Sequence, residues 1–203
     1  MKLKDEFNTL VIAGSWNHAI INPDWISKFI LPNTELKVEI PLNVNGSFRI
    51  STDELRIFSI DGKLNFAILK HEESIYKKIG DLGIAIAEHL IHTPVIGFGI
   101  NYIFECAGNE EIDDLMLVKD SGKISENGFS IVNTTIRREL KIGEKLINLG
   151  IVKGKDTYTI DFNYHNKINS LVEFKDKFES DNMIDFKNES IDILKGLYNM
   201  VME

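Results

Sequence analysis

The sequence predicts an α+β fold, in which a mostly antiparallel sheet built from hairpins is backed by helices. Three observations lead to this prediction. Short segments alternate apolar and polar residues, tight-turn sequences join pairs of these segments, and one long segment at about residues 72–92 has helical periodicity. Strands joined by short turns pair antiparallel, whereas a parallel sheet needs a long crossover after each strand.

The first 70 residues predict strands interrupted by one short helix. Asn22-Pro23-Asp24 has the composition of a helix start, with Asn as the N-cap and Pro at the first helical position, and this helix should stop before Pro32. Asp61-Gly62 is a typical tight hairpin turn. Strands are expected over residues 7–14, 36–42, 48–50, 55–60 and 64–70.

A long amphipathic helix follows, at about residues 72–92. Glu72 and Glu73 suit the positive end of the helix dipole, and Pro94 ends the helix. Its apolar residues are spaced by three or four positions and form one stripe: Ile75, Ile79, Leu82, Ile86 and Leu90.

The strand after this helix, Thr93–Phe104, has an unusual pattern. Its even-numbered positions are bulky from Ile96 onward, whereas the alternate positions include Gly97, Gly99 and Asn101. Side chains alternate between the two faces of a strand, so one face is reduced almost to backbone. A helix, a second subunit or a ligand could cover that face, and we expect a helix.

Residues 107–127 are acidic and rich in glycine, which suggests a linker containing at most a short helix. Strands are expected after it at about 129–140, 145–152 and 156–164, with Lys153-Gly154-Lys155 as a turn, and then two helices that break near 180–182. We expect one compact domain over residues 1–203. The alternative is two sub-domains, 1–108 and 124–203, whose similar strand-then-helix order could reflect a duplication.

Charge and composition favour a soluble cytoplasmic protein. The formal net charge is −8, and both parts of the chain are acidic, because 10 Lys and Arg stand against 13 Asp and Glu in residues 1–108 and 13 stand against 18 in residues 109–203. Nucleic acid is therefore a disfavoured partner. No apolar run approaches the ~18 residues that span a bilayer, and a single cysteine, Cys106, suits a reducing compartment.

The C-terminal hairpins carry the only local concentration of positive charge. We expect it to be a solvated sheet face, because aromatic residues are not interleaved with it. The residues are Arg137, Arg138, Lys141, Lys145, Lys153 and Lys155.

One motif resembles a catalytic site. Pro23-Asp24 followed by Glu35-Leu36-Lys37 resembles the PD…ExK pattern of a large nuclease superfamily. The resemblance implies that Asp24 and Glu35 would hold a divalent cation while Lys37 orients water. Asp24 also has a complete explanation as a residue of the first helical turn.

His89 and His92 are weak candidates for a metal site. They are three residues apart near the end of the long helix, whereas the helical zinc motifs need His-x-x-x-His with an intervening Glu, or His-x-x-Glu-His. Partial negative charge at a helix C-terminus explains both histidines without a metal. We therefore expect no metal and no cofactor.

The remaining features favour binding. Trp16 and Asn17 lie in an expected loop, where binding residues concentrate, although Trp16 could also attach the first helix to the sheet. The preferred hypothesis is a non-catalytic protein–protein interaction protein, such as an adaptor, inhibitor or immunity-type subunit, that binds a protein partner or associates with itself through a sheet edge or helix face. The alternatives are a metal-dependent nuclease or hydrolase, and a small-ligand binder over Gly97, Gly99 and Asn101.

Overall fold

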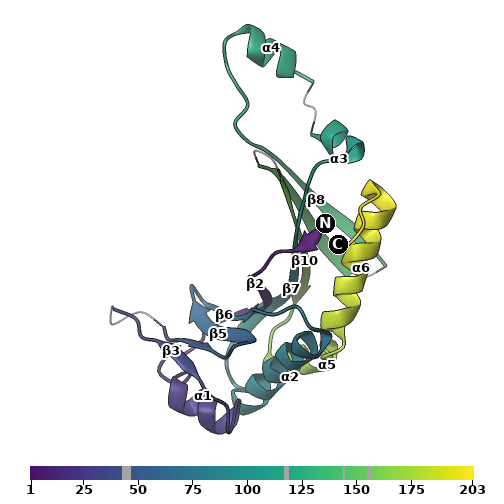
Figure 1. Ribbon diagram of the computed structural model, residues 1–203. Helices are drawn as coiled ribbons and strands as arrows, with labels where there is room; N and C mark the ends of the chain where they lie inside the picture. Colours follow the sequence, from purple (N-terminus) through teal and green to yellow (C-terminus); the bar gives the residue numbers. More distant parts are fainter. Residues whose placement is uncertain (43–46, 117–118, 144, 155–156) are drawn as a thin grey trace.

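The computed structural model describes residues 1–42, 47–116, 119–143, 145–154 and 157–203, and its centre is one ten-stranded sheet (Figure 1). Every strand pairing in these residues is antiparallel, which confirms the predicted fold class. Across the sheet the strands are β3 (Lys37–Glu39), β4 (Arg49–Ser51), β5 (Leu55–Ile60), β6 (Lys63–Ile68), β2 (Phe7–Gly14), β7 (Val95–Cys106), β10 (Tyr158–Lys167), β9 (Lys145–Lys153) and β8 (Thr134–Ile142), and β1 (Lys2–Leu3) pairs with β7.

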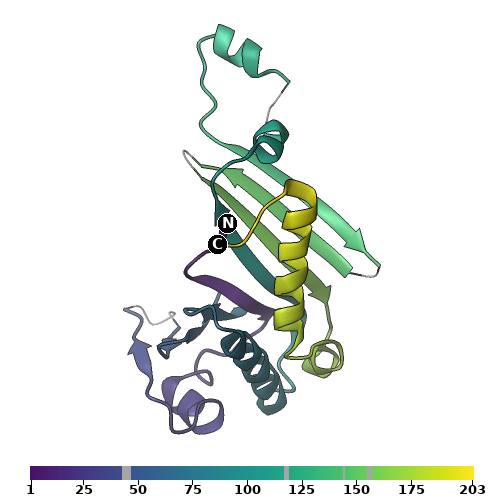
Figure 2. The same ribbon diagram turned by 45° about the vertical axis from the view of Figure 1, so that its right-hand side comes forward.

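Helices cover one face of this sheet. Figures 1 and 2 show α2, α5 and α6 packed along that face, with α1 beside the end of α2 and α4 extended beyond the sheet. The helices are α1 (Pro23–Phe29), α2 (Glu73–His89), α3 (Glu110–Leu115), α4 (Ser121–Glu126), α5 (Leu171–Lys177) and α6 (Asn182–Tyr198).

The expectation that a helix covers Gly97 and Gly99 is wrong, because the helices pack on the opposite face of β7. There the ring of Phe98 lies 5.0 Å from that of Phe174 on α5, and the Tyr102 hydroxyl donates a hydrogen bond to the carbonyl of Met183 on α6. The apolar stripes of the helices bury most surface against the bulky side of the strand. The glycine side is left without a helix in the described part of the chain.

Local turn and cap chemistry forms as the sequence predicts. The Asn22 side chain accepts a hydrogen bond from the backbone N–H of Trp25 at 2.9 Å, which caps α1. Asp61 and Gly62 have φ angles of 50° and 69°, so both occupy the left-handed region that a type I′ hairpin turn requires. This turn joins β5 to β6 and brings Lys63 and Asn65 onto the sheet beside β2.

Between β7 and β8 lie the two short helices α3 and α4, and β8 forms the far edge of the sheet. Residues 117–118 of the expected linker, and Lys155 and Asp156 of the expected turn and strand, lie outside the described residues. The two chain ends lie together, because the N–H of Glu203 donates to the carbonyl of Met1 at 3.0 Å. No helix in the described ranges is long and apolar enough to cross a membrane.

Candidate functional site on the open sheet face

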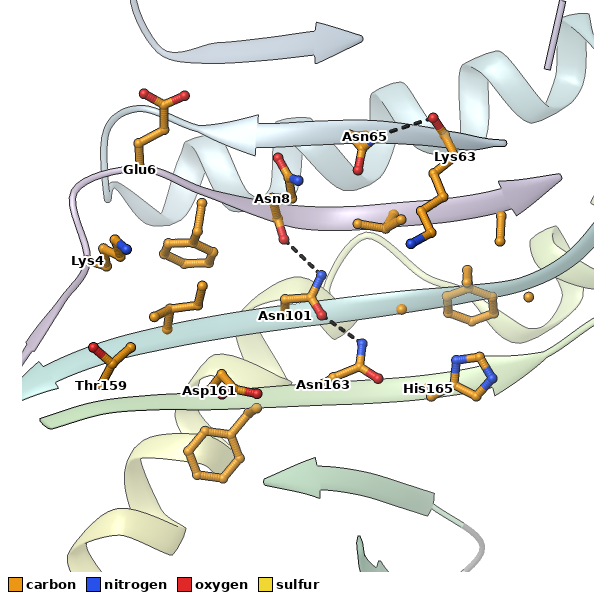
Figure 3. A pocket seen from close by; sticks show the side chains of 18 residues that line it. Lys4, Glu6, Asn8, Lys63, Asn65, Asn101, Thr159, Asp161, Asn163 and His165 are labelled. Carbon is orange, nitrogen blue, oxygen red and sulfur yellow. Dashed lines mark hydrogen bonds between the residues drawn. The ribbon is translucent and has the colours of Figure 1, made fainter. Parts of the chain in front are cut away.

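The uncovered face of the sheet contains a solvent-open hollow of about 950 Å³. Its lining residues come mainly from four adjacent strands, β6, β2, β7 and β10, and Figure 3 shows their side chains from the open side. Gly97, Gly99 and Asn101 all line it. The structure therefore brings together three of the five residues expected at a ligand or interface site.

The floor of this hollow lacks side chains at Gly97 and Gly99 of β7. A Cβ built at Gly99 would lie 2.6 Å from Nδ2 of Asn163, and one built at Gly97 would lie 3.2 Å from Cε1 of His165. Real Cβ atoms do not come as close as the first distance. The glycines on β7 thus provide space into which the side chains of the neighbouring strand β10 lean.

A row of asparagine amides crosses the middle of the hollow (Figure 3). Asn101 on β7 pairs directly with Asn163 on β10, which pairs with Asn148 on β9. Asn101 donates from Nδ2 to the backbone carbonyl of Asn8 at 2.8 Å, Asn163 donates to Oδ1 of Asn101 at 2.7 Å, and Asn148 donates to Oδ1 of Asn163 at 3.2 Å. We call Asn148, Asn163 and Asn101 the amide ladder.

The backbone acceptor at one end fixes the orientation of the whole ladder. A carbonyl oxygen only accepts, so Asn101 must turn its NH₂ group toward Asn8, and its Oδ1 therefore faces Asn163. The same logic orients Asn163 and then Asn148. As far as the described residues go, each amide still has a second N–H and a further oxygen lone pair for another molecule.

Charged groups of both signs surround the ladder. Lys4, Lys63 and His165 line the hollow together with Glu6 and Asp161. Asn65 beside Lys63 is almost fully buried, with 3% of its surface exposed, and its side chain donates to the Lys63 carbonyl at 3.1 Å. The surface is thus polar and mixed in charge.

Asp161, which lines the hollow, has a shifted pKa. Partial burial raises the pKa of its carboxyl above the ordinary 3.8, and the positive charge of Arg137 opposes this rise. The carboxylate lies over Gly150 of β9, where a built Cβ would fall 2.3 Å from Oδ1 of Asp161. A glycine at position 150 is therefore required for this placement.

The arrangement is suited to hydrogen bonding. It offers fixed amide donors and acceptors over a floor without side chains, at a scale that accommodates an extended chain. Across the described residues, no three His, Cys, Asp or Glu side chains lie close enough together to hold a metal ion.

The loop candidates Trp16 and Asn17 do not belong to this surface. Trp16 is buried, with 6% of its surface exposed, and its indole N–H donates to the carbonyl of Ile12 at 2.8 Å. It therefore packs in the core, as a residue that joins the loop to β2. Asn17 is exposed and uses its Oδ1 to accept the backbone N–H of Ala19 at 3.0 Å, which stabilises the loop itself.

Two of the three nuclease-like residues, Asp24 and Lys37, lie apart. Lys37 and Val38 are consecutive on β3, so they point to opposite faces. Asp24 and Val38 line one hollow, whereas Lys37 lines another and pairs with Asp53 at 2.5 Å. Nothing in this geometry places Asp24 beside Glu35 and Lys37 at one cation.

His89 and His92 lie at the end of α2, apart from the open face. The ring of His89 lies 5.2 Å from that of Phe29 and 6.0 Å from that of Trp25, so it packs on the aromatic side chains of α1. These contacts give His89 a structural role between two helices.

Sequence reasoning missed the residues that β10 and β2 add to the site. The alternation of Thr159, Asp161 and Asn163 already indicated one polar side of a strand, but nothing in the sequence indicated that this strand is the neighbour of β7. Asn8 contributes through its backbone carbonyl, which no side-chain pattern reveals.

Comparisons of the chain with protein-family models, with curated proteins and with solved structures found no match.

Proposed function

We propose that the protein is a non-catalytic recognition protein that binds a protein partner on the open face of its sheet. The observation that carries this proposal is the amide ladder above the glycine floor of β7. Amides with fixed orientation, each with a donor and an acceptor that no described residue uses, match the alternating N–H and C=O groups of a polypeptide backbone.

The charges around the ladder support a protein as the occupant. Lys4 and Lys63 are balanced by Glu6 and Asp161 in the same hollow, so the surface has no stripe of one sign. A phosphate backbone needs clustered Lys and Arg, and the net charge of −8 would repel it further. A polypeptide that carries both signs of charge is compatible with this surface.

The preferred location is the cytoplasm. Cys106 is the only cysteine of the chain, it is buried, and burial raises the pKa of its thiol, which lowers its reactivity. A protein with no disulfide is suited to a reducing compartment.

The test compares two substitutions that change charge equally. Asn163→Asp removes the ladder's central donor and places a carboxylate against Oδ1 of Asn101, whereas Asn188→Asp changes an exposed residue on the helical side. Partners captured from the native host by the tagged wild-type protein would be identified, purified and titrated by calorimetry. We expect Asn163→Asp to weaken binding about tenfold, because a loss of roughly 1.4 kcal/mol corresponds to one hydrogen bond to the partner.

Binding by Asn188→Asp should equal that of the wild type. A second substitution, Val11→Lys, places a long cation beside Gly99 without removing a ladder residue, and should also weaken binding. Circular dichroism confirms that each variant is folded. A partner that binds both face variants as tightly as the wild type would refute the proposal.

A small polar ligand is the second candidate, and the size of the hollow favours it. A volume of about 950 Å³ lies within the range of small-molecule sites. Native mass spectrometry of the protein purified from its host distinguishes the candidates. A bound small molecule lost in Asn163→Asp, together with the absence of a protein partner, would replace the first proposal by the second.

A further inference from the structure

Strand β8 ends the sheet on the side opposite β3, and it has a bare outer edge (Figure 2). It pairs with β9 over nine residues, from Thr134 opposite Lys153 to Ile142 opposite Lys145, and no strand in the described residues pairs with its other side. The backbone groups directed outward along such an edge are free to pair with another strand. At the opposite edge, β3 has only three residues.

The side chains of β8 are divided between the two faces of the sheet. Arg137 and Glu139 project from the open face, whereas Ile136 and Leu140 are on the helical side, where they are half-buried against the core. Arg137 and Glu139 are exposed, and neither takes part in an ion pair within the described ranges. The edge therefore presents charge on one face and apolar side chains on the other.

The sequence of β8 is complementary to itself in the antiparallel register centred on Arg138. If two copies of the strand are related by a two-fold axis at Arg138, Arg137 of each copy lies opposite Glu139 of the other. In the same register Ile136 lies opposite Leu140 on the helical side. Opposed residues in an antiparallel pair point to the same face, so both ion pairs form on the open face and both apolar pairs form on the helical face.

The registers centred on Arg137 and on Glu139 lack this complementarity, and one centred on Leu140 opposes Glu139 to Lys141 but loses the pairing of Ile136 with Leu140. An axis at Arg137 places that residue against itself, and an axis at Glu139 places two carboxylates together and Arg137 opposite Lys141. A shift by a single residue would oppose side chains from different faces. Arg138 meets its own copy at the axis, but its Nη1 lies 3.5 Å from the Tyr198 hydroxyl on α6, and this contact directs the two guanidinium groups away from each other.

We propose that β8 docks against β8 of a second copy of this chain, forming a two-fold dimer in which one antiparallel sheet runs through both molecules. Charge complementarity and matched apolar pairs specify the second copy as the occupant of the edge. Because the contact consists mainly of one strand pair, the dimer should be of micromolar strength and should dissociate on dilution. It would place two open faces side by side on one continuous surface.

The test exploits the exchange of charge across the axis. Arg137→Glu alone opposes Glu to Glu at both ion pairs, and Glu139→Arg alone opposes Arg to Arg, so each variant should dimerise at least tenfold more weakly than the wild type. In an equimolar mixture the mixed dimer regains both ion pairs: one joins the native Glu139 of the first variant to the native Arg137 of the second, and the other joins the two substituted residues with the signs exchanged. Sedimentation equilibrium of each variant and of the mixture should therefore show dimer in the mixture and monomer in the separate samples.

Control variants of the same charge change are Lys195→Glu on α6 and Glu126→Arg on α4, both at exposed positions outside β8. They should dimerise as the wild type does. Recovery in the mixture also demonstrates that both single variants are folded.

A wild-type protein that stays monomeric through the highest micromolar concentrations would overturn the proposal. A dimer that survives in both single variants, or a mixture that fails to dimerise, would do the same, because either result assigns the contact to another surface.

Discussion

At the scale of single residues, three glycines determine where the polar side chains of the open face lie. Gly97 lies under His165, Gly99 under Asn163 and Gly150 under Asp161. Each lies directly beside β10, twice on β7 and once on β9. The side chains of β10 therefore lie across the neighbouring strands. A larger residue in place of any of these glycines would occupy the same space.

The placement of Asp161 predicts a dependence of stability on pH. Because burial raises its folded-state pKa above 3.8, the folded protein binds this proton more tightly than the unfolded chain. The free energy of unfolding should therefore fall as the pH rises from 3.8 through the raised pKa. Asp161→Asn removes this loss, so the variant should be more stable than the wild type at pH 7, and the difference should shrink as the pH falls toward 4.

Urea unfolding at a series of pH values measures this difference. The control for the loss of one negative charge is Asp192→Asn, at an exposed position on α6. If Asp161→Asn were less stable than the wild type at pH 7, the attraction to Arg137 would outweigh the cost of burial, contrary to our expectation.

The sequence predicted only those residues of the candidate site that belong to a pattern within a single strand. Gly97, Gly99 and Asn101 stood out because they alternate with bulky residues along β7. Asn163 could not be assigned, since its role depends on a pairing between residues 62 positions apart. The burial of Trp16 could not be predicted from its residue type, because a tryptophan that follows a strand can either fold back into the core or face solvent.

At the scale of elements, α2 approaches its neighbours through glycine. A Cβ at Gly80 would lie 2.7 Å from Cα of Ser180, in the turn between α5 and α6, and a Cβ at Gly83 would lie 2.7 Å from Cδ2 of Leu10 on β2. Glycine lowers the intrinsic stability of a helix interior by about 1 kcal/mol relative to alanine. Close packing of α2 offsets that cost.

Two Gly→Ala substitutions should therefore have opposite effects on stability. Gly80→Ala gains helix propensity but collides with backbone, and we expect a net loss of about 1–2 kcal/mol in the free energy of unfolding. Gly196→Ala lies in α6, where a Cβ would meet nothing within 4 Å, so it should gain about 0.5–1 kcal/mol. Urea denaturation measures both, and a stabilising Gly80→Ala would contradict the close packing.

The sequence predicted the ends of an element well where local residues determine them. It predicted them poorly where pairing with a neighbouring strand determines them. The stripe of α2 and Pro94 placed the helix within three residues of its observed range, Glu73–His89. The strand expected from residue 129 begins instead at Thr134, although Phe129, Ile131 and Val132 continue an apolar pattern. Val132 is 92% exposed, and β9 offers no partner beyond Lys153, which pairs with Thr134.

At the scale of the whole molecule, the chain divides between α2 and β7, earlier than the boundary at residue 108 expected from the sequence, into two parts with a similar strand order. Counted outward from the centre, the first part runs β2, β6, β5, β4 and the second runs β7, β10, β9, β8. The central strand of each part, β2 or β7, lies beside the last strand of that part, β6 or β10, and a helix follows that last strand. The parts meet at the pairing of β2 with β7, where Val11 lies opposite Gly99 in the floor of the hollow. The site therefore forms at the junction of the two parts.

This continuous sheet predicts that both parts unfold together. β7 pairs with β2 on one side and, over ten residues, with β10 on the other, so neither part can lose its strands without exposing the core of the other. Both tryptophans, Trp16 and Trp25, lie in the first part, so tryptophan fluorescence reports on that part while far-UV circular dichroism reports on the whole chain. The two denaturation curves should share one midpoint.

A substitution in the second part makes this test decisive. Ile160 on β10 is fully buried opposite Phe104, so Ile160→Ala should lower the free energy of unfolding by about 2–4 kcal/mol. If the parts are coupled, tryptophan fluorescence should register the whole of this loss, although Ile160 lies far from both tryptophans in the sequence. An unchanged fluorescence midpoint beside a shifted dichroism midpoint would instead mean two independent sub-domains, and the hollow over β2, β7 and β10 would then open whenever either of them unfolds.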